Sequence, residues 1–381
     1  MGDQETAHAA IFSVSRSSDI IRFRARDTAR IPPEPGHGRG HGRGLTTLTI
    51  ALIAPFAFAD AAPAQAPGLQ PDVVFTDYSP LSGNAEIVRR LLSPLAAAQI
   101  QLALAGSGKA MSAQSVDLAK ETFTLYVPPQ PPPHGYGLLV FVPPSQDAGL
   151  PEGWASVLDR HGVIFVAAAR SGNDQNPLAR RAPLALLAAA NVMRRYPVDP
   201  DRVYVGGFSG GARIAMRLAL GYPDLFRGAL LNAGSDPIGD GPPAPPPREL
   251  FLRFQSSTHV VYVTGEQDAE RRQMDIRSIQ SLHNWCVFAL DAHIVPWAGH
   301  QVASPGALSW ALNALQRPAR SDPNALAACR SDVERDLAGK LQQVQTLIAA
   351  GKHDDAQKAL ISLDARFGGL AAPLSVDLAQ K

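Results

Sequence analysis

The chain of 381 residues carries little charge and few cysteines, and both shortages narrow what it can be. Its net charge is +1 and only 18% of its residues are charged, so nothing electrostatic favours nucleic acid or an anionic membrane as a partner. Neither Cys286 nor Cys329 stands beside a histidine or a second cysteine at a metal-binding or redox spacing. Whether the two cysteines pair stays open, and any role for them is structural.

The chain also lacks a membrane-spanning run near its N-terminus, because the apolar stretch of residues 45–59 is too short. A basic flank precedes this stretch and small residues follow it, a pattern that predicts a secretory signal peptide over residues 45–66. A buried helix is the alternative. Residues 1–44, rich in arginine and ending in a His/Gly repeat, are expected to be a disordered tail or an over-extended gene start. The mature protein is then secreted or periplasmic, without a stable membrane span.

The rest of the chain predicts one large α/β domain followed by a small appendage. Residues 72–120 are expected to form a loop and a helix, and residues 121–127 an edge strand that ends at a proline run. Further strands are predicted at residues 138–142, 163–166, 203–205, 229–231, 260–263 and 293–295. Helices are predicted at residues 154–160, 184–196, 212–221, 273–288 and 305–315. Because these strands are apolar without alternation, we predict a doubly wound, mostly parallel sheet over residues 72–316.

A linker separates this domain from residues 324–381, which carry two apolar stripes at helical spacing around a turn at Gly351. The pattern predicts an antiparallel helical hairpin that resembles one unit of a tetratricopeptide repeat. A single such unit cannot bury its own apolar face. The hairpin is therefore expected to dock on the α/β domain or on another subunit.

Residues 203–216 predict a strand, a sharp turn and a helix. The turn is Gly207-x-Ser209-x-Gly211, the pattern of a nucleophile elbow that lifts the serine hydroxyl clear of a sheet. Glycines fit on both sides because a Cβ there would collide with the strand or the helix. We therefore predict that Ser209 is a nucleophile.

A serine nucleophile needs a histidine to take its proton and an acid to orient that histidine. In a doubly wound sheet, these groups belong in loops at the carboxyl ends of strands. His300 follows the last predicted strand through a glycine-containing turn, and Asp268 lies in the loop one strand earlier, so we predict them as base and acid. The weaker candidates are Glu266, Asp291 and Asp236 for the acid, and His259, His283 and His293 for the base.

Residues 196–211 and 222–228 resemble the secreted polyhydroxybutyrate depolymerase and feruloyl esterase branch of the α/β-hydrolases. The segments at Asp268 and His300 are similar to that family's acid and base loops, and the likeness covers roughly residues 120–316. The resemblance implies ester hydrolysis through an acyl-enzyme, without metal or cofactor.

The chain departs from that family at the loop that supplies one oxyanion donor. Pro143 and Pro144 stand where the family usually has His-Gly, and proline has no N–H to donate. Gly210 still offers one backbone N–H, and the second is expected from Ser145 or Gln146. A missing donor of this kind costs roughly 100 to 1,000 fold in turnover.

The segment between residues 231 and 260 is expected to hold a stiff proline run and a short connection instead of a folded lid. An uncapped site suits a bulky or polymeric ester, with Trp297 and Asn173 as candidate substrate contacts. Two alternatives stay open. One is a serine peptidase on the same fold, and the other is a hydrolase-fold binding protein whose oxyanion hole is impaired by the prolines.

Overall fold

The computed structural model describes residues 66–381, with gaps at residue 240 and at residues 320–321. The tail predicted for residues 1–44 lies outside the described residues, as does all but the last residue of the signal peptide predicted for residues 45–66. No helix in the described part of the chain combines the length and the apolarity that a bilayer crossing requires.

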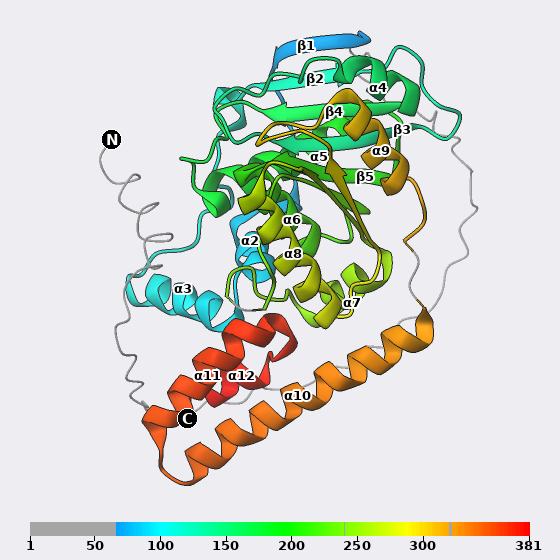
Figure 1. The fold of residues 1–381 in the computed structure, drawn as a ribbon. Coiled ribbons are helices and arrows are strands. Elements are labelled where there is room, and N and C mark those ends of the chain that lie inside the picture. The colour runs from blue at the N-terminus through cyan, green and yellow to red at the C-terminus, as the bar shows by residue number, and fades with distance from the viewer. Residues whose placement is uncertain (1–65, 240, 320–321) are drawn as a thin grey trace, which may run out of the picture.

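The described strands form one sheet of eight, in the order β1, β2, β4, β3, β5, β6, β7, β8 (Figure 1). β2 runs antiparallel to both of its neighbours, β1 and β4, and all the other pairs are parallel. The strands are Gly68–Val73 (β1), Phe123–Val127 (β2), Tyr136–Val142 (β3), Val163–Ala168 (β4), Val198–Phe208 (β5), Gly228–Asn232 (β6), His259–Gly265 (β7) and Leu290–Val295 (β8). This order is that of the α/β-hydrolase fold, so the predicted doubly wound, mostly parallel sheet is confirmed.

Helices cover both faces of the sheet, and each face has its own apolar core. Helices α4 (Trp154–His161) and α9 (Pro305–Leu315) pack on one face, and α5 (Ala182–Arg195), α6 (Gly210–Gly221) and α8 (Ala269–Asn284) pack on the other. Consecutive residues of β3 show why its sequence does not alternate. Leu138 belongs to one core and Leu139 to the other, and neither is exposed.

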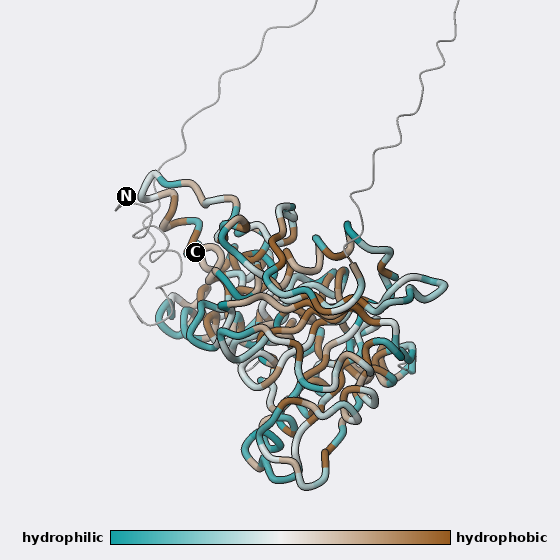
Figure 2. The backbone as a smooth tube through the Cα atoms, turned by 90° about the horizontal axis from the view of Figure 1, so that it is seen from above, coloured by the Kyte–Doolittle hydropathy of each residue, from teal (hydrophilic) through white to brown (hydrophobic). Residues whose placement is uncertain are grey.

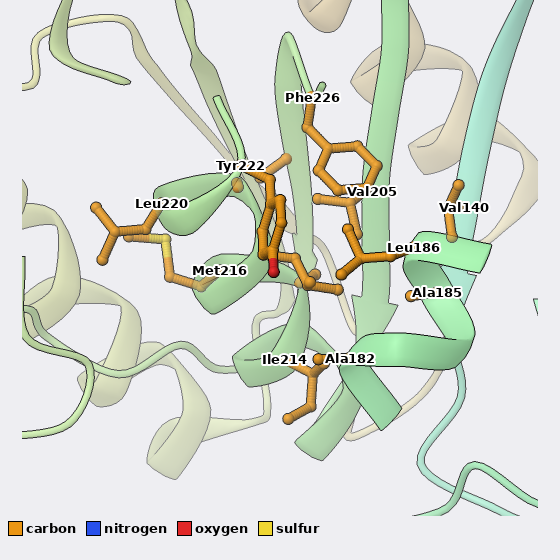
Figure 3. Close-up of a cluster of buried hydrophobic side chains, with 14 of the residues drawn as sticks. Val140, Ala182, Ala185, Leu186, Val205, Ile214, Met216, Leu220, Tyr222 and Phe226 are labelled. Carbon is orange, nitrogen blue, oxygen red and sulfur yellow. The ribbon is translucent and has the colours of Figure 1, made fainter. Parts of the chain in front are cut away.

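The core beneath α5 and α6 is where the sheet supports the predicted nucleophile. Figure 3 shows Ala182 and Leu186 of α5, Ile214 and Met216 of α6 and Val205 of β5 in this cluster. In Figure 2 the apolar segments run through the middle of the molecule, with hydrophilic segments mostly around them. The elbow between β5 and α6 therefore starts from a rigid, buried base.

Two expectations about residues 66–127 are wrong. The edge strand is β1, and residues 121–127 contain β2, which is paired on both sides. β1 is hard to recognise because it contains glycine and proline and is mostly exposed. The sequence also predicts a single helix within residues 72–120, but the structure has two, α2 (Asn84–Leu91) and α3 (Pro94–Gly106). The second helix begins anew because Ser93 caps it and Pro94 lies in its first turn.

The segment between β6 and β7 is also more structured than expected, since it contains helix α7 (Arg248–Ser257) after the proline run. Phe251 and Phe254 of α7 are buried in the core that α6 shares. This helix therefore packs into the domain. It is hard to recognise in the sequence because it has only ten residues and follows the proline run directly.

The C-terminal residues form the predicted hairpin, α10 (Pro323–Ala349) and α11 (His353–Phe367), followed by the short α12 (Leu374–Leu378), at the bottom of Figure 1. Cys286 and Cys329 are joined by a disulfide, with their Cα atoms 5.7 Å apart. The Gly369 N–H donates a 2.8 Å hydrogen bond to Pro245 O in the proline run. Apolar side chains of the hairpin, Leu337 and Phe367 among them, are continuous with the core of the sheet.

Candidate active site

Ser209 sits in a strained turn between β5 and α6, at the carboxyl end of the sheet. Its φ and ψ are +54° and −118°, a conformation that costs free energy for a residue with a side chain. A Cβ on Gly207 would lie 2.3 Å from the carbonyl carbon of Gly211, and one on Gly211 would lie 1.9 Å from Val142 O. Both glycines are therefore required by close backbone approach, as the motif predicts.

Three side chains meet in one hydrogen-bonded chain at this turn. His300 Nε2 lies 3.0 Å from Ser209 Oγ, and His300 Nδ1 lies 2.6 Å from Asp268 Oδ2. With its proton on Nδ1, the imidazole donates to the carboxylate and leaves Nε2 free to accept from the serine hydroxyl. The ring of Phe208 packs against His300 at a centroid distance of 4.9 Å. Asp268 is buried at the start of α8, whereas the His300 side chain is 41% exposed, so the chain of groups opens to solvent.

The weaker candidates make other contacts. Glu266 accepts a 2.9 Å hydrogen bond from the backbone N–H of Trp297. Asp291 bonds His259 Nε2 and Arg317 at 2.7 Å each, and Asp236 lies 3.8 Å from Arg217. The sequence favours Asp268 but keeps Glu266 as a weaker candidate, because both lie in the same loop; in the structure it is Asp268 that faces His300.

The predicted oxyanion loop follows β3 and is held through its carbonyl groups. Pro144 O accepts from Asn173 N at 2.9 Å, and Gln146 O accepts from Arg170 N at 2.8 Å. Among the described residues, no hydrogen bond occupies the backbone N–H of Ser145, Gln146 or Gly210. The site therefore has three unoccupied backbone donors on the elements that flank Ser209.

Asn173 lies against the turn that follows the serine. A Cβ on Gly210 would fall 2.0 Å from Asn173 Oδ1 and 2.8 Å from its Nδ2, so only glycine leaves room for this carboxamide. Asn173 is exposed, and none of the described residues hydrogen-bonds to its side chain. The amide is thus free to face a ligand.

Trp297 is held rigidly by its backbone while its side chain is 82% exposed. Its φ is +61°, a left-handed conformation, and the Glu266 carboxylate accepts from its N–H. A Cβ on Gly265 would meet Ala298 O at 2.3 Å, so the loops that carry Asp268 and Trp297 touch through their backbones. The described residues contain no group of three or more His, Cys, Asp or Glu side chains that could hold a metal ion.

Asn232, at the end of β6, joins the elements of the site although no sequence pattern marks it. Its carbonyl accepts from Ser209 N at 2.8 Å, its Nδ2 donates to Val263 O at 2.9 Å and its Oδ1 accepts from Ala303 N at 2.7 Å. Ala303 follows His300 by three residues. The backbone carbonyl of Asn232 therefore binds the elbow, while its buried side-chain amide links β7 to the segment after the base. Its only sequence signal is a polar residue directly after a buried apolar strand.

No protein-family model matches the chain. The poly(3-hydroxybutyrate) depolymerase of Ralstonia pickettii is 31% identical over an alignment of 98 residues that covers 22% of this chain and 20% of that protein. The chain thus spans about a fifth of the length of this curated relative. The match confirms the resemblance that the sequence predicts.

Two solved structures illustrate the likeness in fold. The S-formylglutathione hydrolase of Staphylococcus aureus matches 51% of this chain and 92% of its own, with a TM-score of 0.42 and 12% identity. The feruloyl esterase module of Clostridium thermocellum matches 51% of this chain and 82% of its own, with a TM-score of 0.38 and 13% identity. The fold assignment itself rests on the strand order described above.

Proposed function

We propose that this chain is a secreted serine hydrolase that cleaves carboxylic esters through an acyl-enzyme. The observation that carries the proposal is the hydrogen-bonded chain from Ser209 through His300 to Asp268, with links of 3.0 and 2.6 Å. Ser209 Oγ attacks the ester carbonyl while His300 Nε2 takes its proton, and Asp268 stabilises the resulting imidazolium. His300 then gives the proton to the leaving alcohol. Water attacks the acyl-enzyme by the same route and releases the acid.

The tetrahedral intermediates carry a negative charge on the former carbonyl oxygen, which needs donors. We assign one to the Gly210 N–H at the first turn of α6, where the helix dipole also favours negative charge. The second comes from the N–H of Ser145 or Gln146. The carbonyl groups of Pro144 and Gln146 are hydrogen-bonded, whereas the N–H groups of Ser145 and Gln146 have no partner among the described residues. This arrangement supports the role.

The substrate class follows from the openness of the site. The side chains of His300 and Trp297 are exposed, and α7 packs into the domain. We propose a bulky or polymeric ester, a polyester or an acylated polysaccharide, with Trp297 and Asn173 as contacts beside the reacting carbonyl. The match to a poly(3-hydroxybutyrate) depolymerase supports a polyester, although it covers only a fifth of that enzyme.

The test is mass spectrometry of the protein after treatment with a fluorophosphonate, with Ser209→Ala and His300→Ala as partners. We expect one adduct on the Ser209 peptide of the native protein, none in Ser209→Ala, and much slower labelling in His300→Ala. An ester and amide panel then separates esterase from peptidase. No adduct and no ester turnover by folded protein would refute the proposal and favour a non-catalytic binding protein.

Export is supported by the signal-peptide pattern at residues 45–66 and by the disulfide, which persists in oxidising compartments. Sequencing the N-terminus of the protein recovered from the producing cells tests it. We expect cleavage after Ala59 or Ala66, and an intact N-terminus on protein inside the cell would contradict export.

A further inference from the structure

Arg181 is a buried guanidinium beneath the proposed oxyanion site, and the sequence pattern gives no hint of its role. It is 4% exposed and ends a π-helical turn, Pro177–Arg181, that leads into α5. π-Helical turns are rare and are often found at functional sites.

Its three hydrogen bonds go to three separate elements around Ser209. Nη2 donates to Pro143 O at 2.9 Å, after β3, and Nε donates to Ser171 O at 2.8 Å, after β4. Nη1 donates to Gly210 O at 3.4 Å, in the residue that follows the nucleophile. Only a planar guanidinium fork offers N–H groups in three such directions.

The charge of Arg181 is not balanced by a bonded carboxylate among the described residues. Burial lowers its pKa to about 10, and the nearby positive charges of Arg213 and Arg217 act in the same direction, whereas the negative charge of Asp174 acts against them. The group nevertheless stays protonated at neutral pH. Burying a cation that pairs only with neutral carbonyls costs stability, so such a group is expected where it serves the site.

The proline pair explains why a carbonyl anchor is needed here. Pro143 and Pro144 have no N–H, so at these two positions the backbone of the loop after β3 can be held only through its carbonyl groups. Pro143 O binds Arg181, Pro144 O binds Asn173 N and Gln146 O binds Arg170 N. Anchoring by acceptors leaves the N–H groups of Ser145 and Gln146 free to donate.

We infer that Arg181 is a positioning residue of the oxyanion site. It holds the loop after β3, the loop after β4 and the Gly210 turn in one register, and it places a positive charge behind the donors that receive the developing negative charge. This inference rests on the proposed function. It predicts that Arg181 stabilises the transition state much more than the bound ester, because the oxyanion exists only after attack.

The experiment compares Arg181→Met and Arg181→Lys with Arg202→Met as a matched control. Arg202 is a partly buried arginine in the amino-terminal half of β5, at the end of the strand away from Ser209. It likewise donates to two backbone carbonyls, Gly135 O at 3.3 Å and His161 O at 2.7 Å. The assays are kcat and KM on a soluble p-nitrophenyl ester, inhibition by an aryl trifluoromethyl ketone, which forms a tetrahedral adduct, and the melting temperature.

For Arg181→Met we expect kcat to fall by roughly 100 fold or more with KM little changed, in the range seen on removal of an oxyanion donor. The ketone should lose affinity by a similar factor. Arg181→Lys keeps the charge without the fork and should fall between Arg181→Met and the native protein. Arg202→Met should retain native kcat.

A folded Arg181→Met protein with near-native kcat would overturn the inference, and so would a loss matched by Arg202→Met. If Arg181→Met does not fold, Arg181→Lys decides, since an unchanged kcat and ketone affinity would overturn the inference equally. Failure of the proposed function looks different, because the native protein itself would then neither hydrolyse esters nor react with the fluorophosphonate. If the enzyme is active and depends on Ser209, but its kcat does not change when Arg181 is replaced, this inference is refuted while the proposed function stands.

Discussion

Asp275 is a buried carboxyl group whose ionisation should weaken the fold as the pH rises from 3.8 to about 7. It lies on α8 and is 5% exposed. Its Oδ2 accepts from the Thr264 hydroxyl, and its Oδ1 has no hydrogen-bond partner among the described residues. Burial raises the pKa of Asp275 from 3.8 to about 7. Replacement by asparagine, which has the same shape and no charge, tests what this costs.

Proton linkage determines whether stability rises or falls with pH. Between pH 3.8 and about 7 the folded chain holds a proton on Asp275 that the unfolded chain has lost. The contribution of this group to stability is therefore complete below pH 3.8 and is lost as the pH rises to about 7. Each unit of pKa difference is worth about 1.4 kcal/mol, so the whole loss is at most about 4 kcal/mol. Asp275→Asn escapes this loss.

The assay is urea unfolding of the native protein and Asp275→Asn at about pH 5 and about pH 9. We expect the variant to gain up to about 3 kcal/mol relative to the native protein between these two conditions. This double difference cancels any constant packing effect of the amide. Asp332→Asn, at a mostly exposed position on α10, is the control and should show almost no change. An equal stability difference at both pH values would refute the reasoning.

Three further predictions concern the disulfide, the elbow and the exposed tryptophan. Replacing both Cys286 and Cys329 with serine should lower the free energy of unfolding by at most about 4 kcal/mol in guanidinium titrations, because a separation of 43 residues is no longer closed. An unchanged midpoint would contradict this. Gly211→Ala should abolish fluorophosphonate labelling, because its Cβ would meet Val142 O, whereas Gly306→Ala on α9 has open space and should keep full labelling. Trp297→Ala should slow release of product from an insoluble polyester while leaving stability and acetate ester turnover nearly native. Equal losses on both substrates would speak against a contact with the polymer.

Sequence patterns predicted the parts of the fold in which burial itself leaves a pattern. The parallel strands are continuous apolar runs because both their faces are covered, and Leu138 and Leu139 of β3 show this directly. β1 escaped because it is paired on one side and mostly exposed, so its residues are not constrained to be apolar. The break at Pro94 was missed because the apolar stripes of α2 and α3 run on from one to the other.

The site, too, contains residues that a sequence pattern marks and residues that no pattern marks. Ser209, Asp268 and His300 lie in loops whose order along the chain is set by the fold, and a glycine motif marks the serine. Asn232 and Arg181 act by binding backbone carbonyls and amides of segments that are distant in the sequence. Every segment of the chain carries backbone carbonyl and amide groups, so the residue types of the bound segment give no sign of the contact. Only the folded backbone shows which amide or guanidinium joins the loops.

The proline pair after β3 has a different meaning once these contacts are known. From the sequence, the loss of two N–H groups argues for an impaired oxyanion site. Proline removes donors but keeps its carbonyl, and here the carbonyls of Pro143 and Pro144 are both bonded. Because these carbonyl groups anchor the loop, the backbone N–H groups of Ser145 and Gln146 are not used in hydrogen bonds among the described residues. If Ser145 or Gln146 supplies the second donor, the prolines and Arg181 form one arrangement, and replacing the arginine should harm catalysis more than restoring an N–H by Pro144→Ala.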